Sequence, residues 1–206
     1  DDRAAELVRM CAAPKSRLRL PDLGWLTEEE TPPLEAGNLR LLCARWMVHE
    51  GLYDEAREQL TGLKPEEVAA PATLLFYQSV VHHTLLDKEE GLEAVARLLD
   101  AEEHSPRRYV VMARLMQQDL EDLEEDSLDH IARRMGDIRR RLKLGRAGKK
   151  VQDVERGVIE SLDELIKKLE QQQQQQQSGG GPKDNIQSSR PAPDSMIIGG
   201  KGKGDV

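Results

Sequence analysis

The chain has 206 residues, of which 33% are charged and 38% hydrophobic, and its formal net charge is −8 at pH 7. This acidity argues against nucleic acid as the partner, and no apolar run reaches the ~20 residues that a membrane-spanning helix needs. Aromatic residues are scarce, with one Phe, two Trp and three Tyr. Leu, Ala, Glu, Arg and Gln, which lose little side-chain freedom in a helix, are abundant, so we predict an all-α protein.

Residues 1–35 are expected to form a short amphipathic helix, which ends before Pro14, and then an ordered arm. The chain begins with Asp1 rather than Met, which would suit the mature form of an exported, periplasmic protein; a cytoplasmic protein is the alternative. The arm carries apolar side chains that would be costly to expose to water, namely Leu18, Leu20, Leu23, Trp25 and Leu26.

Residues 36–126 are predicted to contain several short helices. Thr31 followed by Pro32 predicts a capped helix start, and Gly51 is expected to end that helix. Asp54 is expected to cap the next one. The helices expected here cover about 32–50, 54–63, 64–86, 88–101 and 105–123.

Residues 127–177 show the apolar spacing of a packed helix pair. The first seam consists of Leu128, Ile131, Met135, Ile138 and Leu142. The second seam consists of Val151, Val154, Val158, Leu162, Leu165 and Leu169. A short turn with Gly145 and Gly148 separates them, so we predict a long antiparallel helical hairpin, and oligomerisation as a coiled coil through its second helix stays open.

The second helix of this hairpin is expected to continue into the Gln tract, to Gln177, because Gln is a good helix former. Residues 178–206 are rich in Gly, Ser, Pro and Lys, with one apolar patch at 196–198. Such a segment buries too little apolar surface to offset the entropy of ordering, so we predict a disordered tail.

The stretch HEGLYDEAREQL, residues 49–60, lies inside a pattern of small residues at fixed spacing. Ala44 and Ala56 are twelve residues apart, and Ser79 and Gly91 repeat the same spacing thirty-five residues later. This pattern resembles the tetratricopeptide repeat (TPR), in which two antiparallel helices recur every 34 residues and small residues let their backbones approach closely. The resemblance covers about 36–106 and implies a concave surface that binds proteins or peptides.

The resemblance to the TPR family is partial. Arg40 and Leu75 occupy the position where the family has Trp, and Arg114 and Asp126 occupy the small-residue positions of a third copy. The whole layout is also similar to that of uncharacterised bacterial exported proteins with a long terminal helix, a Gln tract and a Gly/Pro-rich tail. No activity follows from this second likeness.

No catalytic or cofactor-binding motif is present, so we expect a protein that is not an enzyme and binds no cofactor or metal. His82 and His83, with Asp87 nearby, are the only adjacent histidines. Neighbouring helical residues point about 100° apart, so the two imidazoles are poorly placed to share one ion. Cys11 and Cys43 lack zinc or C-x-x-C spacing and are read either as two buried thiols or as one disulfide.

Charge is strongly segregated in the second half of the chain. The acids of the acidic run at residues 119–129 are Asp119, Glu121, Asp122, Glu124, Glu125, Asp126 and Asp129. The bases that follow are Arg133, Arg134, Arg139, Arg140, Arg141, Lys143, Arg146, Lys149 and Lys150, against the single acid Asp137. We expect most of these bases to be compensated by the acidic run and by acids of the second hairpin helix.

Two functions are therefore kept open. The first is a non-enzymatic scaffold or interaction module that binds an unidentified protein or peptide, with the tail as a flexible tether. The second is an anion-binding module for nucleic acid or an anionic surface polymer. Its candidate residues, called the basic tip below, are Arg139, Arg140, Arg141, Arg146, Lys149 and Lys150.

Overall fold

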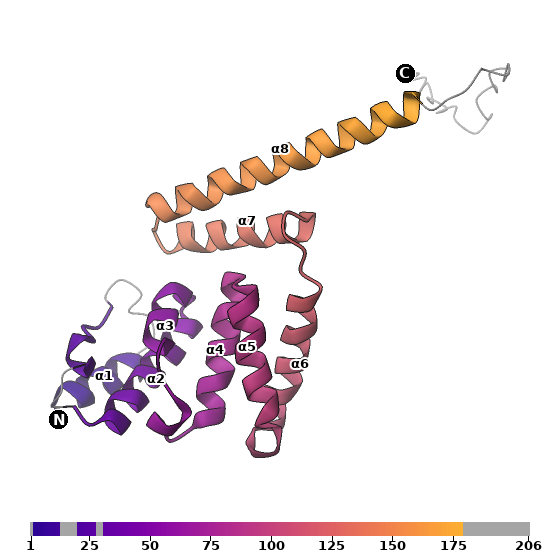
Figure 1. The fold of residues 1–206 in the computed structure, drawn as a ribbon. Helices are drawn as coiled ribbons and strands as arrows, with labels where there is room; N and C mark the ends of the chain where they lie inside the picture. Colours follow the sequence, from indigo (N-terminus) through magenta and orange to yellow (C-terminus); the bar gives the residue numbers. More distant parts are fainter. Residues whose placement is uncertain (1, 13–19, 28–30, 179–206) are drawn as a thin grey trace, which may run out of the picture. The chain divides into compact units, whose positions relative to one another are not determined.

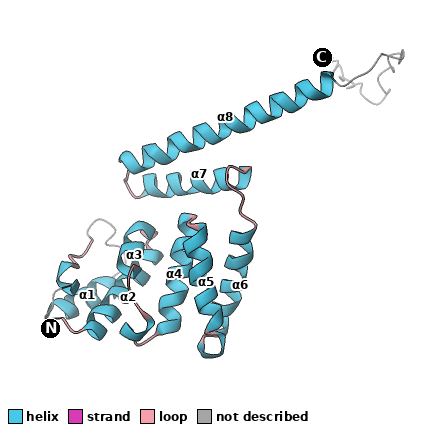
Figure 2. Cartoon of the chain, in the orientation of Figure 1, coloured by secondary structure: helices cyan, strands magenta, loops and turns pink. Residues whose placement is uncertain are grey.

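The computed structural model describes residues 2–12, 20–27 and 31–178, and these residues form helices and loops without any strand (Figures 1 and 2). The all-α prediction is confirmed for this part of the chain. Its helices are α1 (Asp2–Ala12), α2 (Pro33–His49), α3 (Tyr53–Leu60), α4 (Pro71–Leu85), α5 (Lys88–Asp100), α6 (Arg107–Glu121), α7 (Leu128–Lys143) and α8 (Lys149–Ser178).

The chain divides into two units, residues 1–163 and residues 164–206. The described residues of the second unit, 164–178, continue α8. The predicted disordered tail lies outside the described residues from 179 onward. Among the helices that are described, none is both long and apolar enough to cross a membrane.

In the first unit, α2 contacts α4 and α4 contacts α6, so these three helices form one row, called the α2–α4–α6 row below (Figure 1). Helix α3 contacts α2 and α4, and α5 contacts α4 and α6. One apolar core lies between α1, α2, α3 and α4, and a second lies between α4, α5 and α6. Phe76 of α4 packs against both cores, which links them.

The small residues of the predicted pattern all lie inside this stack. Ala44, Ala56 and Ser79 are completely buried, and Ser79 satisfies its hydroxyl by donating to the carbonyl oxygen of Leu75 at 2.9 Å. Gly91 is buried as well, and a Cβ atom there would lie 2.8 Å from a methyl carbon of Leu120 in α6. A larger side chain at any of these positions would collide with a neighbouring helix.

A closer approach, which the pattern did not indicate, occurs at Gly37 in the first turns of α2. A Cβ atom at Gly37 would overlap the carbonyl oxygen of Glu67, which belongs to the short 3-10 turn Pro65–Glu67. Glycine is therefore needed at this position because backbone meets backbone there.

Two predicted helix caps are wrong. The residue before α2 is Pro32, and the Thr31 hydroxyl instead donates to the carbonyl oxygen of Trp25 at 3.0 Å, which ties the arm to the start of α2. The cap of α3 is Leu52, without a side-chain hydrogen bond, whereas Asp54 lies in the first turn of that helix. The Asp54 carboxylate faces α7 instead, where it meets Arg141.

Three other boundaries or burials differ from expectation. Helix α3 ends at Leu60, and α4 begins only at Pro71, because the segment before it forms the 3-10 turn Pro65–Glu67. Trp25 and Leu26 of the arm are buried as expected, but Leu20 is 45% exposed. Leu18 lies outside the described residues.

The predicted seam of α7 is largely exposed. Leu128, Met135 and Leu142 are 71%, 54% and 48% exposed, whereas Ile131 is buried. Helix α7 turns its charged side toward the other helices, where ion pairs fix its rotation, and this leaves the apolar stripe facing outward. In α8, Val151 and Val158 are buried, but Leu169 is exposed.

Candidate functional site

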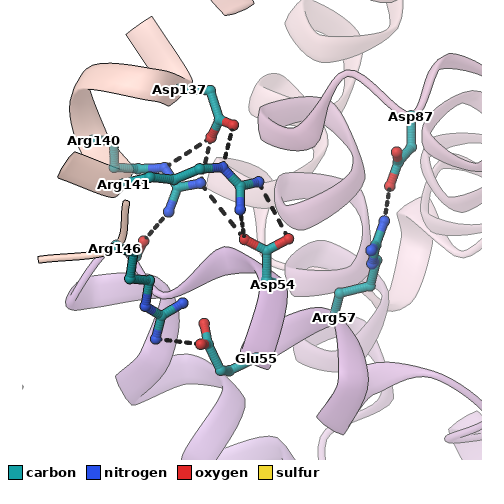
Figure 3. Close-up of polar contacts among 9 residues, drawn as sticks. Asp54, Glu55, Arg57, Asp87, Asp137, Arg140, Arg141 and Arg146 are labelled. Atoms are coloured by element: carbon teal, nitrogen blue, oxygen red, sulfur yellow. Dashed lines mark hydrogen bonds and ion pairs between the residues drawn. The ribbon is translucent and has the colours of Figure 1, made fainter. Parts of the chain in front are cut away.

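The C-terminal half of α7 meets the start of α3 through charged groups (Figure 3). Arg141 contacts the carboxylates of Asp137 and Asp54, with its Nη2 atom 3.3 Å from Asp54 Oδ1. Arg140 also pairs with Asp137 and donates to the carbonyl oxygen of Gly51, in the turn between α2 and α3. These contacts join residues almost ninety positions apart.

The ion-paired cluster of Arg141, Asp54 and Asp137 is largely buried, so its charges bind one another rather than a partner molecule. The Arg141 side chain is only 7% exposed, and those of Asp54 and Asp137 are each 13% exposed. Burial alone would lower the pKa of Arg141, but hydrogen bonds to Asp137 and Asp54 outweigh it and raise the pKa. The guanidinium therefore stays charged and paired.

The predicted basic tip is thus divided in two. Arg140, Arg141 and Arg146 are ion-paired, the last with Glu55 of α3. Arg139 and Lys149 are exposed and form no ion pair with the described residues, and the side chain of Lys150 is outside them. The acids that compensate these arginines come from α3 and α7, not from the acidic run; nothing in the local sequence indicates that partner.

The N-terminal half of α7 does pair with the acidic run. Arg133 contacts Asp119 near the end of α6, with Nη2 2.8 Å from Oδ1, and it also contacts Asp129. His83 of α4 lies 2.6 Å from the same Asp119 carboxylate. Hydrogen bonding from Arg133, more than that from His83, lowers the pKa of Asp119 to about 2, although partial burial opposes it.

The two adjacent histidines contact different carboxylates. His82 Nδ1 is 3.1 Å from Asp87, which also pairs with Arg57, whereas His83 reaches Asp119. Among the described residues, no group of three or more His, Cys, Asp or Glu is arranged to hold a metal ion.

Aromatic rings of α4 and α6, together with arginines of α2 and α6, contact one another in sequence across these three helices. The ring of Phe76 stacks on Tyr109 of α6 at 4.1 Å and meets Tyr77 edge-on at 5.4 Å. The guanidinium of Arg45 in α2 lies 5.7 Å from the Tyr77 ring centre, and that of Arg108 in α6 lies 5.0 Å from the Tyr109 ring centre. We call these five residues the aromatic row.

Arg45 and Arg108 differ from the arginines of α7. Both are exposed, and neither pairs with a carboxylate among the described residues. Burial would raise the pKa of Tyr109, but a hydrogen bond with Thr73, a hydrogen bond with Arg108 and the positive charges of Arg108 and Arg45 together lower it.

Apolar side chains continue this surface along α6. Val111, Met112 and Leu115 are 50%, 45% and 56% exposed, and they follow Arg108 on one side of the helix. An open hollow of about 600 Å³ lies beside Leu115. Its lining includes Met112, Leu115 and Met116 together with His83, Asp119 and Arg133.

Sequence inspection missed the aromatic row because its members are scattered over three helices. Arg45, Phe76 and Tyr109 lie about thirty residues apart, and only the alignment of successive helices brings them together. The one available signal was that the single Phe and two of the three Tyr fall near the starts or centres of α4 and α6.

The two cysteines are adjacent but unbonded. Cys11 Sγ of α1 and Cys43 Sγ of α2 are 3.8 Å apart, and both are free thiols in this structure. Their hydrogen bond lowers the pKa of Cys11 and, together with burial, raises that of Cys43. Of the two thiols only Cys43 is buried, deep in the first core, whereas Cys11 is half-buried beside it.

Three exposed features have side chains suited to binding a partner. They are the exposed part of the basic tip, the aromatic row and the apolar side of α6. Models of known protein families, curated proteins and solved structures give no match to this chain.

Proposed function

We propose that this protein is a non-enzymatic interaction module that binds a protein partner on its α2–α4–α6 row. The observation that carries the proposal is the exposure of Val111, Met112 and Leu115 beside the aromatic row. Large apolar side chains that are exposed together, and bordered by polar groups, are typical of interaction sites. Aromatic residues and arginine are also the types enriched at such interfaces.

We further propose that α2 with α3, and α4 with α5, are TPR-like units, and that α6 closes the stack. The burial of Ala44, Ala56, Ser79 and Gly91 supports this interpretation, as does the order of helix contacts. The resemblance implies a concave protein-binding surface, and we assign that role to the α2–α4–α6 row.

We also propose that α7 and α8 form an antiparallel hairpin. Its support is a hydrogen bond from the Ser161 hydroxyl to Asp126, just before α7, at 2.6 Å. The burial of Val151 and Val158 on the first half of α8 agrees with it.

Site-specific photo-crosslinking tests the proposed binding face. A photoreactive amino acid at Leu115 should capture a protein in the cells that make this chain, and the same residue at Ala96, exposed on α5, should not. The captured protein, once purified, should bind the unmodified chain, lose binding to Leu115→Asp and keep binding to Ala96→Asp. Equal capture from both positions would remove the proposal.

The second candidate function is anion binding by the basic tip. It is favoured by the exposure of Arg139 and Lys149, which have no ion pair among the described residues. It ranks below the first because Arg140, Arg141 and Arg146 are already neutralised. A chain that binds heparin with an affinity that falls steeply with salt, and loses this binding in Arg139→Glu/Lys149→Glu, would reverse the order.

A further inference from the structure

The aromatic row carries two exposed arginines, Arg45 and Arg108, and neither pairs with a carboxylate among the described residues. Arg133, Arg140, Arg141 and Arg146 each face a carboxylate, whereas Arg45 and Arg108 face aromatic rings. The faces of aromatic rings attract cations but leave their charge uncompensated. A carboxylate that binds at this row would compensate that positive charge.

The ring contacts also hold both guanidinium groups in place. Arg45 lies against Tyr77 and Arg108 against Tyr109, and Phe76 packs between the two tyrosine rings. Arginine side chains that are already restrained lose less conformational entropy when they bind a carboxylate. Both charges are thus partly preorganised, and no carboxylate of the described residues neutralises them.

The same surface has an exposed apolar side chain, Leu115, at a fixed distance from Arg108. Leu115 is seven residues beyond Arg108, two turns along the same side of α6, which is a rise of about 10 Å. The hollow beside Leu115 is lined by Met112 and Met116. In an extended polypeptide, about three residues cover that distance.

We propose that Arg45 and Arg108 form a subsite for a carboxylate of the partner polypeptide, and that the hollow beside Leu115 receives an apolar side chain of the same segment. This rests on the proposed function and specifies the partner's chemistry. The segment is extended and carries Asp or Glu about three residues away from a bulky apolar residue. Electrostatic complementarity then fixes its position on the row, and apolar burial adds affinity.

Three labelled nine-residue peptide libraries test the proposal against the full chain. Each is random except for two fixed residues three positions apart, which are Glu and Leu, Gln and Leu, or Lys and Leu. Fluorescence anisotropy should show the Glu library binding at least tenfold tighter than the Lys library, with the Gln library between them. Arg45→Gln/Arg108→Gln should abolish this preference, whereas Arg97→Gln, at an exposed arginine of α5, should retain it.

The outcomes separate this inference from the function on which it rests. Equal binding of all three libraries, lost in Leu115→Asp, would overturn the carboxylate subsite and leave the binding face intact. Absence of binding by every library would overturn both. Sedimentation velocity tests whether a second copy of this chain occupies the row. If the unmodified chain is a dimer that dissociates in Arg45→Gln/Arg108→Gln, a second copy binds there and the proposal is wrong. Unchanged circular dichroism of the variants shows that they are folded.

Discussion

The stack from α2 to α6 packs through side chains such as Leu74 and Leu98 and, in the turn between α2 and α3, Leu52, which are almost completely buried, whereas α7 buries only Ile131 and Arg141. In the stack the small residues Ala44 and Ala56 let helices approach closely. In α7 and the turn after it, the corresponding contacts are made by arginine side chains that reach Asp54, Asp119 and, from Arg146 in the turn, Glu55. One region is therefore held mainly by apolar burial and the other mainly by ion pairs.

This difference predicts different responses to the solution. Apolar burial is largely insensitive to moderate salt, whereas partly exposed ion pairs are screened by it. Regions with few buried apolar contacts also open locally at lower free energy than the core. We therefore expect α7 to separate from α3 and α6 under conditions in which α2–α6 stays folded.

The largest effect is expected from Gly37→Ala. The added Cβ overlaps the carbonyl oxygen of Glu67, and relief requires a backbone shift in α2 or in the 3-10 turn, so the free energy of unfolding should fall by about 3 to 4 kcal/mol. Urea unfolding followed by circular dichroism measures this. The matched control is Gly136→Ala in α7, where nothing lies within 4 Å; it should stabilise that helix by about 0.5 to 1 kcal/mol.

A somewhat smaller effect is expected from Ala56→Leu. Ala56 is completely buried between α3 and its neighbours, so three more carbon atoms should overpack this contact and cost about 2 to 3 kcal/mol. Ala96→Leu, on the exposed side of α5, is the control and should change stability little. If Ala56→Leu kept the melting temperature of the unmodified chain, as the control should, the TPR-like interpretation of the small residues would be wrong.

The sequence predicted those features of the fold that depend on local periodicity and on turn residues. The positions of α5, α6, α7 and α8 agree with their apolar spacing to within a few residues. The caps failed because both side chains bond elsewhere: Thr31 donates to the carbonyl oxygen of Trp25, six residues earlier, and Asp54 pairs with Arg141, 87 residues later. A local pattern carries no information about a partner as distant as Arg141.

The candidate site was less predictable for the same reason. The basic tip was visible as a charge run, but its neutralisation by Asp54 and Glu55 depends on how α7 lies across α3. The aromatic row needs three successive helices in register before Arg45 and Arg108 come near Tyr109. Sequence spacing can suggest that register, but it does not show which side chains meet.

Arg141→Met should weaken the attachment of α7 specifically. It leaves Asp54 and Asp137 buried without their main partner, and we expect a loss of about 1 to 2 kcal/mol, less than for a fully enclosed pair. Hydrogen exchange should become faster in α7 while α4 and α5 stay protected. Arg139→Met, at an exposed arginine of the same helix, is the control and should leave exchange unchanged. Faster exchange across α2–α6 as well would contradict the separation of the two regions.

The smallest effect concerns the pH dependence of the contact between α6 and α7. The pKa of Asp119 is about 2 in the folded chain, below its ordinary value of 3.8, mainly because Arg133 donates to its ionised form. A depressed pKa stabilises the fold fully at pH values above the ordinary one, and this contribution disappears as the pH falls from about 3.8 through about 2. Asp119→Asn should therefore lower the melting temperature near pH 5, and its difference from the unmodified chain should vanish toward pH 2.

Asp100→Asn, which removes an exposed carboxylate at the end of α5, gives the baseline for this comparison. A difference for Asp119→Asn that is constant from pH 5 to pH 2 would mean that the ion pair with Arg133 does not hold α7 to α6.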